Sequence, residues 1–264
     1  PCANDTAIIT LTIHPAPTPT GIDPIAPVCE NEMASVKVNG LVDGNYVVEY
    51  NIAGSTETPA TLTVSGGGTS SSFNTRTLLI GDTGDPLNIT KITNVDVTPN
   101  CSVTTFETEN LTVNPLPTAN LTSDDVDDII CDGDTVIFTG TGGLTYEFLL
   151  NNVALSAPSA TATYTTDTLN NGDAVTVVAY NAFGCVDTST TITTTVNPLP
   201  TAGLMSDDID NVICEADTVT FTATGGATYE FLLNNVSLAP ASATTTYTTD
   251  SLNNADLVAV IVTN

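Results

Sequence analysis

Residues 145–152 read Thr-Tyr-Glu-Phe-Leu-Leu-Asn-Asn, and the same eight residues return 83 positions later at 228–235. Residues 114–119 read Asn-Pro-Leu-Pro-Thr-Ala and return at 197–202 with the same shift. Over the shared span about two thirds of the positions are identical, so the chain contains an internal duplication. A period of this length within 264 residues indicates several small domains in tandem.

Each copy carries the pattern of short β-strands. Val136 and Phe138 keep their apolar character in the other copy, whereas Ile137 between them becomes Thr220. This alternation predicts a strand with one face toward a core. The Asn pair at 151–152 predicts a tight hairpin turn, because Asn tolerates positive φ. About seven such strands without a helix are typical of an immunoglobulin-like sandwich, so we expect an all-β fold.

The repeat also sets the expected domain limits. His14-Pro-Ala-Pro-Thr takes the place of the Asn-Pro-Leu-Pro-Thr linker, and Cys2 precedes His14 by the same spacing as Cys185 precedes Asn197. We therefore expect a rod cut from a longer array. Its parts are the last strand of a preceding repeat (1–13), a longer and divergent first repeat (14–113), a second repeat (114–196), and a third repeat (197–264) that lacks its final strand.

The composition excludes several partners. Thirty acidic and three basic residues give a formal net charge of -27, which would repel nucleic acid and anionic membranes. The chain has no apolar run of the length that a membrane-spanning helix needs, so we expect no membrane insertion.

The cysteines recur at fixed places in the repeats. One precedes the second strand of each repeat (Cys29, Cys131, Cys214), and one begins the last strand (Cys2, Cys101, Cys185). Small sandwiches gain stability from a bridge, so we predict Cys29–Cys101 and Cys131–Cys185, with Cys2 and Cys214 bonded to partners outside this stretch. In a standard immunoglobulin strand order these two places lie at opposite poles, so a bond between neighbouring repeats, such as Cys29–Cys185, is the open alternative.

Acidic clusters follow each proline-rich linker. Several carboxylates close together repel one another, and a hard cation bound through oxygen would relieve the repulsion and stiffen the junction. We therefore expect calcium, and no other cofactor; a simple solvated loop is the alternative. The candidate ligands are Asp124, Asp125, Asp127, Asp128, Asp207, Asp208 and Asp210.

Catalytic chemistry has little support. His14 is the only histidine, and it lies in a linker, where a catalytic group is hard to preorganise. We expect the chain not to be an enzyme.

The linker, the segment 130–139 (Ile-Cys-Asp-Gly-Asp-Thr-Val-Ile-Phe-Thr) and the segment 181–185 (Asn-Ala-Phe-Gly-Cys) carry a family resemblance. The chain resembles the PKD-like and immunoglobulin-like repeats of very large Bacteroidota surface proteins, including gliding-motility adhesins exported by the type nine secretion system. The resemblance implies an extracellular location, adhesion and often calcium. Asp-Thr/Ser-apolar triplets also resemble the O-glycosylation sequon of Bacteroidota, and would place glycans on Thr6, Thr135, Thr168, Thr218 and Ser251.

Two functions follow as hypotheses. The first is a structural stalk of a secreted cell-surface adhesin, or a surface filament in which identical chains assemble laterally through edge strands. Its partners would be the neighbouring repeats of the same chain, with polysaccharide or other cells bound by regions outside this stretch. The second is a spacer or carbohydrate-binding region of a secreted polysaccharide-degrading enzyme, which the absence of Trp platforms disfavours.

Overall fold

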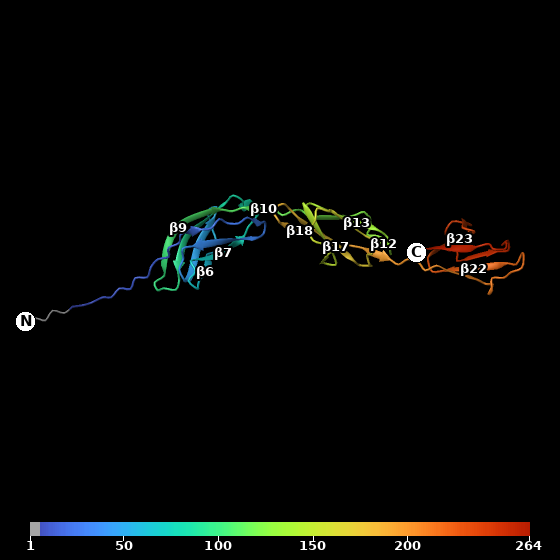
Figure 1. The fold of residues 1–264 in the computed structure, drawn as a ribbon, viewed down its shortest axis with the longest axis horizontal. Helices are drawn as coiled ribbons and strands as arrows, with labels where there is room; N and C mark the ends of the chain where they lie inside the picture. Colours follow the sequence, from blue (N-terminus) through green and yellow to red (C-terminus); the bar gives the residue numbers. More distant parts are fainter. Residues whose placement is uncertain (1–5) are drawn as a thin grey trace, which may run out of the picture.

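The computed structural model describes residues 6–264, which form β-strands and a single short 3-10 helix, η1 (Ile80–Asp82). Figure 1 shows three β units in a line, with the N-terminal segment extending away from one end of the rod. Each unit has its own cluster of buried apolar side chains. The chain is therefore an all-β array of tandem immunoglobulin-like sandwiches.

The first repeat is the largest unit. One sheet has the order β5-β4-β8-β9 with β6 also paired to β4, a second has the order β1-β3-β7, and β2 pairs in parallel with β10. The strands are β1 (Gly21–Ile22), β2 (Val28–Cys29), β3 (Met33–Asn39), β4 (Gly44–Ile52), β5 (Ser55–Thr56), β6 (Ala60–Val64), β7 (Ser70–Thr77), β8 (Pro86–Asn94), β9 (Cys101–Asn110) and β10 (Val113–Asn114).

The second repeat has the same plan with shorter strands. The sheet β11-β13-β16 faces a sheet of order β15-β14-β17-β18 with β19 also paired to β17, and β12 pairs in parallel with β20. The strands are β11 (Asn120–Ser123), β12 (Ile129–Cys131), β13 (Val136–Thr141), β14 (Thr145–Leu150), β15 (Val153–Ala154), β16 (Thr163–Thr166), β17 (Ala174–Tyr180), β18 (Val186–Thr188), β19 (Ile192–Thr193) and β20 (Thr195–Asn197).

The third repeat reproduces six strands of the second, but residues 212–214, which correspond to β12, form no strand. Its sheets have the orders β21-β22-β25 and β24-β23-β26. Among the described residues, β26 has no outer neighbour of the kind that β18 and β19 give to β17. The strands are β21 (Gly203–Ser206), β22 (Val219–Thr224), β23 (Thr228–Leu233), β24 (Val236–Ser237), β25 (Thr246–Thr249) and β26 (Val258–Thr263).

Local sequence explains these strands. In β13, Val136 and Phe138 are buried and Ile137 is exposed, as the alternation predicts. Asn151 and Asn152 both have positive φ, 53° and 64°, and turn the chain from β14 into β15. Two successive positive-φ residues define the type I′ turn whose twist suits a two-residue hairpin, so the predicted hairpin is confirmed.

Candidate functional site

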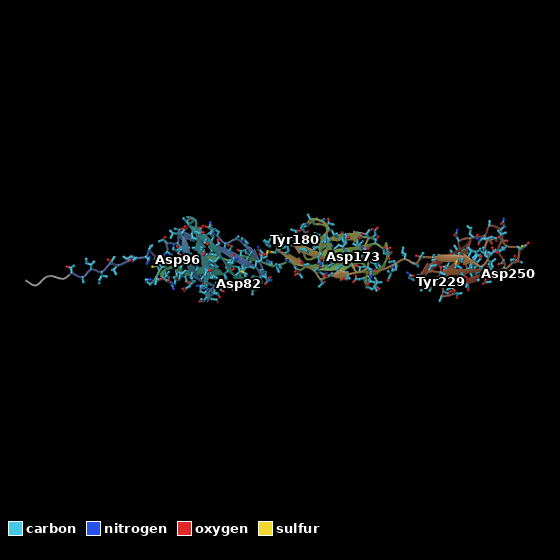
Figure 2. The ribbon with its side chains drawn as sticks, turned by 90° about the horizontal axis from the view of Figure 1, so that it is seen from below. Asp82, Asp96, Asp173, Tyr180, Tyr229 and Asp250 are labelled. Atoms are coloured by element: carbon cyan, nitrogen blue, oxygen red, sulfur yellow. A yellow bond between two sulfur atoms is a disulfide. The ribbon has the colours of Figure 1, made fainter. Side chains whose placement is uncertain are left out.

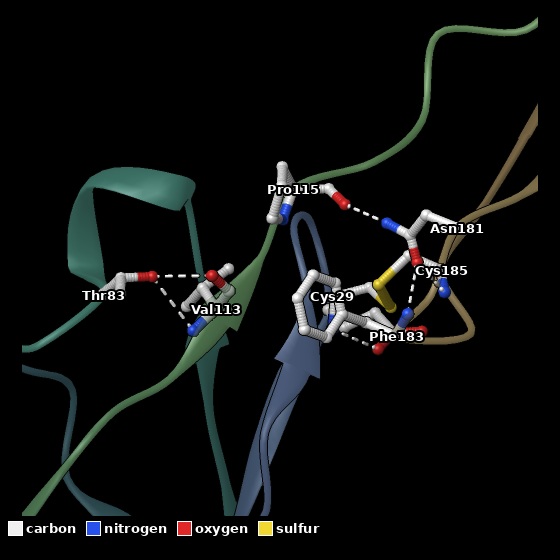
Figure 3. Close-up of a disulfide and its surroundings, with 8 residues drawn as sticks. Cys29, Thr83, Val113, Pro115, Asn181, Phe183 and Cys185 are labelled. Atoms are coloured by element: carbon white, nitrogen blue, oxygen red, sulfur yellow. Dashed lines mark hydrogen bonds between the residues drawn. A yellow bond between two sulfur atoms is a disulfide. The ribbon is translucent and has the colours of Figure 1, made fainter. Parts of the chain in front are cut away.

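A disulfide joins the first repeat to the second. Cys29, at the end of β2, is bonded to Cys185, with 5.6 Å between their Cα atoms and 156 residues between them in sequence. Figure 3 shows the bond between the end of the first repeat and a loop of the second. The within-repeat pairings Cys29–Cys101 and Cys131–Cys185 are therefore wrong, and the between-repeat alternative holds.

The two poles of the first repeat explain the correction. Cys29 lies beside β10, where the chain leaves the repeat, and the amide of Glu30 donates to the Asn114 carbonyl. Cys101 lies at the other pole, where its thiol is 3.5 Å from the carbonyl oxygen of His14 in the entry linker. A disulfide needs Cα atoms roughly 4.4–6.8 Å apart, which opposite poles of a sandwich cannot supply.

Three other cysteines in the described part of the chain carry free thiols: Cys101, Cys131 and Cys214. Cys2 lies outside the described residues. Bonds from Cys2 and Cys214 to partners beyond this stretch stay a prediction.

A tight loop presents Cys185 to the first repeat. The side-chain oxygen of Asn181 accepts hydrogen bonds from the amides of Phe183 (2.9 Å) and Cys185 (3.0 Å). Gly184 has a φ of 82°, which closes the turn and suits glycine. The loop geometry therefore comes from Asn181 and Gly184, and it fixes where the sulfur points.

The linker itself is held on both sides. The carbonyl of Asn114 accepts from the first repeat, and the carbonyl of the next residue, Pro115, accepts from the Asn181 side chain of the second (2.7 Å). The Ala119 amide donates to Asp187 (2.9 Å), also in the second repeat. Because neighbouring residues are tied to different repeats, the junction has almost no free linker.

Two glycine positions show how closely the linker packs. A Cβ on Gly142 would lie 1.7 Å from the Thr118 carbonyl oxygen, and a Cβ on Gly225 would lie 1.8 Å from that of Thr201. Only glycine fits at such an approach. The linker before the third repeat is thus seated like the one before the second, and Asn264 donates to the Pro198 carbonyl (2.9 Å) as Asn181 does to Pro115.

An ion pair supports the first-repeat side of the junction. Arg76 donates to both carboxylate oxygens of Asp82 (2.9 and 2.7 Å), and this guanidinium lowers the pKa of Asp82. The following residue, Thr83, exchanges hydrogen bonds with the backbone of Val113 in β10 (Figure 3). Figure 2 places Asp82 in the first repeat. The Arg76–Asp82 ion pair holds η1 beside β10, the strand at which the chain leaves this repeat.

The acidic clusters occupy the β11–β12 loop and its third-repeat counterpart. Their carboxylates accept hydrogen bonds from nearby backbone amides: Asp124 from Ile137, and Asp125 from Asp127 and Ile129. In the third repeat Asp207 accepts from Thr220, and Asp208 and Asp210 both accept from Val212. These aspartate side chains therefore stabilise the loop by accepting hydrogen bonds from backbone amides in and beside it.

One aspartate is an exception. Burial, together with the charges of Asp125 and Asp127, raises the pKa of Asp128. Within residues 6–264 no three acidic, histidine or cysteine side chains gather as metal ligands. The predicted ligands thus form no preassembled site, and calcium binding stays a prediction.

The five predicted glycosylation residues are all exposed: Thr6, Thr135, Thr168, Thr218 and Ser251. Thr168 lies 3.2 Å from the hydroxyl of Thr166, and Ser251 lies 3.0 Å from that of Thr249. Exposure is what a modifying enzyme requires, and glycosylation stays a prediction.

Sequence reasoning missed Asn181 and Asp187 as junction residues. A signal for the first existed: Asn181 and Asn264 are identical at the repeat spacing, although the strand residues just before them, Tyr180 and Thr263, differ. No signal pointed to Asp187, because residues 197–264 contain no counterpart of it.

No family model matches the chain, and no curated protein matches it. Among solved structures it is similar to a three-immunoglobulin-domain fragment of titin (10% identity, 94% of this chain and 98% of that chain covered, TM-score 0.38). It is also similar to the N-terminal eight Ig domains of Down Syndrome Cell Adhesion Molecule (13%, 94% and 42%, 0.38). A third is the fibronectin(III)-like modules of Clostridium thermocellum CbhA (10%, 68% and 94%, 0.32). At these values the fold assignment rests on the chain's own sheets and cores.

Proposed function

We propose that the chain is a stalk or spacer segment of a secreted bacterial cell-surface adhesin or surface filament, with no catalytic role. The observation that carries the proposal is the Cys29–Cys185 bond, which fixes one repeat to the next. A spacer holds a distant part of its protein at a set distance, and a covalent, linker-free junction limits the bending that would shorten it.

Within residues 6–264 no helix is long and apolar enough to cross a bilayer. Three further features support the proposed role. Disulfides persist in oxidising compartments such as the cell exterior. The resemblance of residues 114–264 to repeats of large Bacteroidota surface proteins supports the bacterial surface in particular. The net charge of -27 keeps such an exposed array soluble.

Small-angle X-ray scattering of the dilute, oxidised protein tests the stalk. We expect the distance distribution of a single extended rod, and a broader distribution for Cys185→Ser, because that change frees the first junction. Cys101→Ser is the matched control and should leave the scattering unchanged. Scattering from the oxidised wild type that fits a compact particle or freely jointed domains would refute the proposal.

The surface location needs a separate test. An antibody against the second repeat should label intact cells that produce the protein. Labelling only after lysis would refute the surface location and leave the rod geometry untouched.

A further inference from the structure

The second and third repeats each have an open strand edge in the middle of their sequence. β16 is the outer strand of the sheet β11-β13-β16 and pairs with β13 alone among the described strands. β25 pairs in the same way with β22 alone. Both strands have the sequence Thr-Tyr-Thr-Thr and are followed by Asp. We call these two strands, Thr163–Thr166 and Thr246–Thr249, the open edges.

The backbone groups of Thr165 point away from the sheet. Thr165 lies opposite Ile137 in the β13–β16 register. The amide of Ile137 donates to the Asp124 carboxylate (2.8 Å), and its carbonyl accepts from the Asp124 amide (3.1 Å), on the side away from β16. In an antiparallel ladder such a pair exchanges no hydrogen bonds, so the amide and carbonyl of Thr165 point to solvent. Those of Thr163, two residues earlier, point the same way.

The third repeat has the same outward backbone groups at Thr246 and Thr248. Thr248 lies opposite Thr220, whose amide and carbonyl both bond Asp207 (2.9 and 3.0 Å). The side chains of the outward threonines are exposed in both repeats. Each open edge therefore presents amide and carbonyl groups that have no partner in the described part of the chain, which makes it a template for another strand.

The first repeat protects the corresponding edge. β6, a five-residue strand paired to β4, packs beside β7, the outer strand of the sheet β1-β3-β7. Arg76 of β7 also bonds Glu57 (3.1 Å) and Asp82 (2.7 Å), which adds charge at this edge. In the second repeat a single bridge between Tyr146 and Ser159 takes the place of β6. Proteins commonly blunt an edge by charge or by cover, so β16, which has neither, is available for pairing.

The flanks that carry the open edges are uncharged. The chain has a net charge of -27, so most of its surface repels a second copy. Residues 148–166, which include β16, contain no charged side chain, and neither do residues 231–249, which include β25. These flanks also expose Val153 and Val236 at equivalent positions. A contact between two flanks therefore buries no carboxylate, the cost that disfavours contact elsewhere.

We propose that an open edge of one copy pairs antiparallel with an open edge of a second copy, so that the two sheets join into one. Thr163 of each copy lies opposite Thr165 of the other, and each pair exchanges backbone hydrogen bonds. Tyr164 then lies at the two-fold axis. β25 has the same sequence and can take the place of β16 in either copy. The proposal rests on the filament form of the proposed function and names the surface through which the filament forms.

The sequence of the open edge suits a second copy of itself. With Thr163 opposite Thr165, Asp167 of each copy lies opposite Thr161 of the other, so the two carboxylates stay at opposite ends of the pairing. Like charges directly opposite one another would destabilise it. A two-fold contact uses the same patch on both copies, which is the commonest arrangement in homo-oligomers. Each edge is only four residues long, so we expect each contact to be weak.

Hydrogen exchange of the oxidised chain, with its free thiols alkylated, tests the pairing at about 10 µM and about 1 mM. We expect the outward amides of both open edges to exchange at least about fivefold more slowly at the higher concentration, because pairing protects them. The amides of Tyr164 and Tyr247 face β13 and β22 at both concentrations, and should not change. Analytical ultracentrifugation of the same samples should show species larger than 27.2 kDa at the higher concentration.

Two double variants at the same positions separate backbone from side chain. Thr165→Pro with Thr248→Pro removes an outward amide from each open edge and no hydrogen bond to β13 or β22. We expect the midpoint concentration of association to rise at least about tenfold, because hydrogen bonds between copies are lost. Thr165→Val with Thr248→Val is the matched control. It keeps both amides and the β-branched shape, and should change the midpoint by less than about threefold.

A monomer at every concentration would overturn the proposal and would leave the rod expected from scattering of the dilute protein unaffected. Association that leaves the outward amides unprotected would also overturn it, because the contact would then lie elsewhere. So would equal weakening by the proline and valine pairs, which would assign the contact to the hydroxyl groups. The exchange measurement uses the wild type, so it decides the question even where a proline variant does not fold.

Discussion

In the second repeat β17 lies between β14 and the strands β18 and β19, whereas in the third repeat the equivalent β26 pairs with β23 alone among the described strands. The two sequences are about two thirds identical, and their hairpins and aromatic ring contacts match. Eight residues nevertheless form the buried cluster of the second repeat and three that of the third. Formation of each strand thus depends on residues within and beside it. Full burial of the core also depends on strands such as β18 and β19, which pair with β17.

The largest difference that we expect between the two repeats concerns two equivalent phenylalanines. Phe138 stacks on Tyr164 with ring centroids 6.1 Å apart, and Phe221 stacks on Tyr247 at 6.2 Å. Phe138 is fully buried and Phe221 is not. Phe138→Ala should lower the unfolding free energy of its repeat by about 3–5 kcal/mol. We expect a loss of roughly half as much for Phe221→Ala, because water already reaches that ring.

Hydrogen exchange at increasing denaturant concentration, measured separately for each repeat, gives both losses of unfolding free energy. Equal losses would show that the pairing of β18 and β19 with β17 does not set the core energetics.

A smaller effect is expected at Ser189, which lies between β18 and β19. Ser189 is buried, and its hydroxyl accepts from the Val177 amide and donates to the Thr190 carbonyl (2.8 Å). Ser189→Ala should destabilise the second repeat by about 1–3 kcal/mol, because it leaves a buried amide unpaired. Exchange of the Val177 amide should then approach that of Val260. Unchanged protection of Val177 would mean that this hydroxyl is dispensable.

A change of opposite sign is expected at Asp128, whose counterpart in the third repeat is Asn211. Both residues have positive φ, 56° and 57°, which Asn adopts readily. The pKa of Asp128 is raised by burial and by two neighbouring aspartates, so its ionised form costs stability above that pKa. Asp128→Asn should therefore stabilise the second repeat at pH 7, by less than about 1 kcal/mol because solvent screens this partly exposed carboxylate.

The pH dependence provides the check. As the pH falls through the raised pKa, wild-type Asp128 takes up a proton and the advantage of the variant should vanish. Thermal melts at pH 7 and at pH 3 measure this. A gain that persists at pH 3 would assign the effect to backbone conformation rather than to charge.

The smallest predicted effect is that of calcium. We expect about 1 mM calcium to raise the melting temperature by about 1–2 °C through the acidic loops, with reversal by chelator. Magnesium at the same concentration is the control, since it demands a stricter geometry. Equal shifts from both ions would reflect general screening, and no shift would remove calcium from the account.

The sequence predicts much of the fold. The period of the repeat and the alternation around Phe138 predict the sandwiches, and the Asn pairs predict the hairpins, because these depend on neighbouring residues. The cysteine pairing was predicted wrongly, since it depends on which pole each strand reaches. Cys29 and Cys101 share a repeat in sequence, but the path of β2 and β9 carries them apart.

The acidic clusters illustrate another limit. The clustering of Asp124 and Asp125 with other aspartates predicts metal ligands, a prediction that stays open, whereas the hydrogen bonds that both carboxylates accept from amides within or beside the loop were not foreseen. Such bonds depend on backbone geometry, and the residue types alone do not reveal it. The role of Asn181 could not be predicted for the same reason, because it depends on the position of the Pro115 carbonyl to which its side chain donates.

The central claim is that a disulfide between Cys29 and Cys185 fixes the first repeat to the second, and pulling single molecules by their termini tests it directly. In the oxidised chain the Cys29–Cys185 bond bypasses the 156-residue segment, so force should not extend most of the first two repeats. Reduction should add on the order of 500 Å of contour length. An added length near 250 Å, as expected for a Cys29–Cys101 bond, or no added length, would contradict the account.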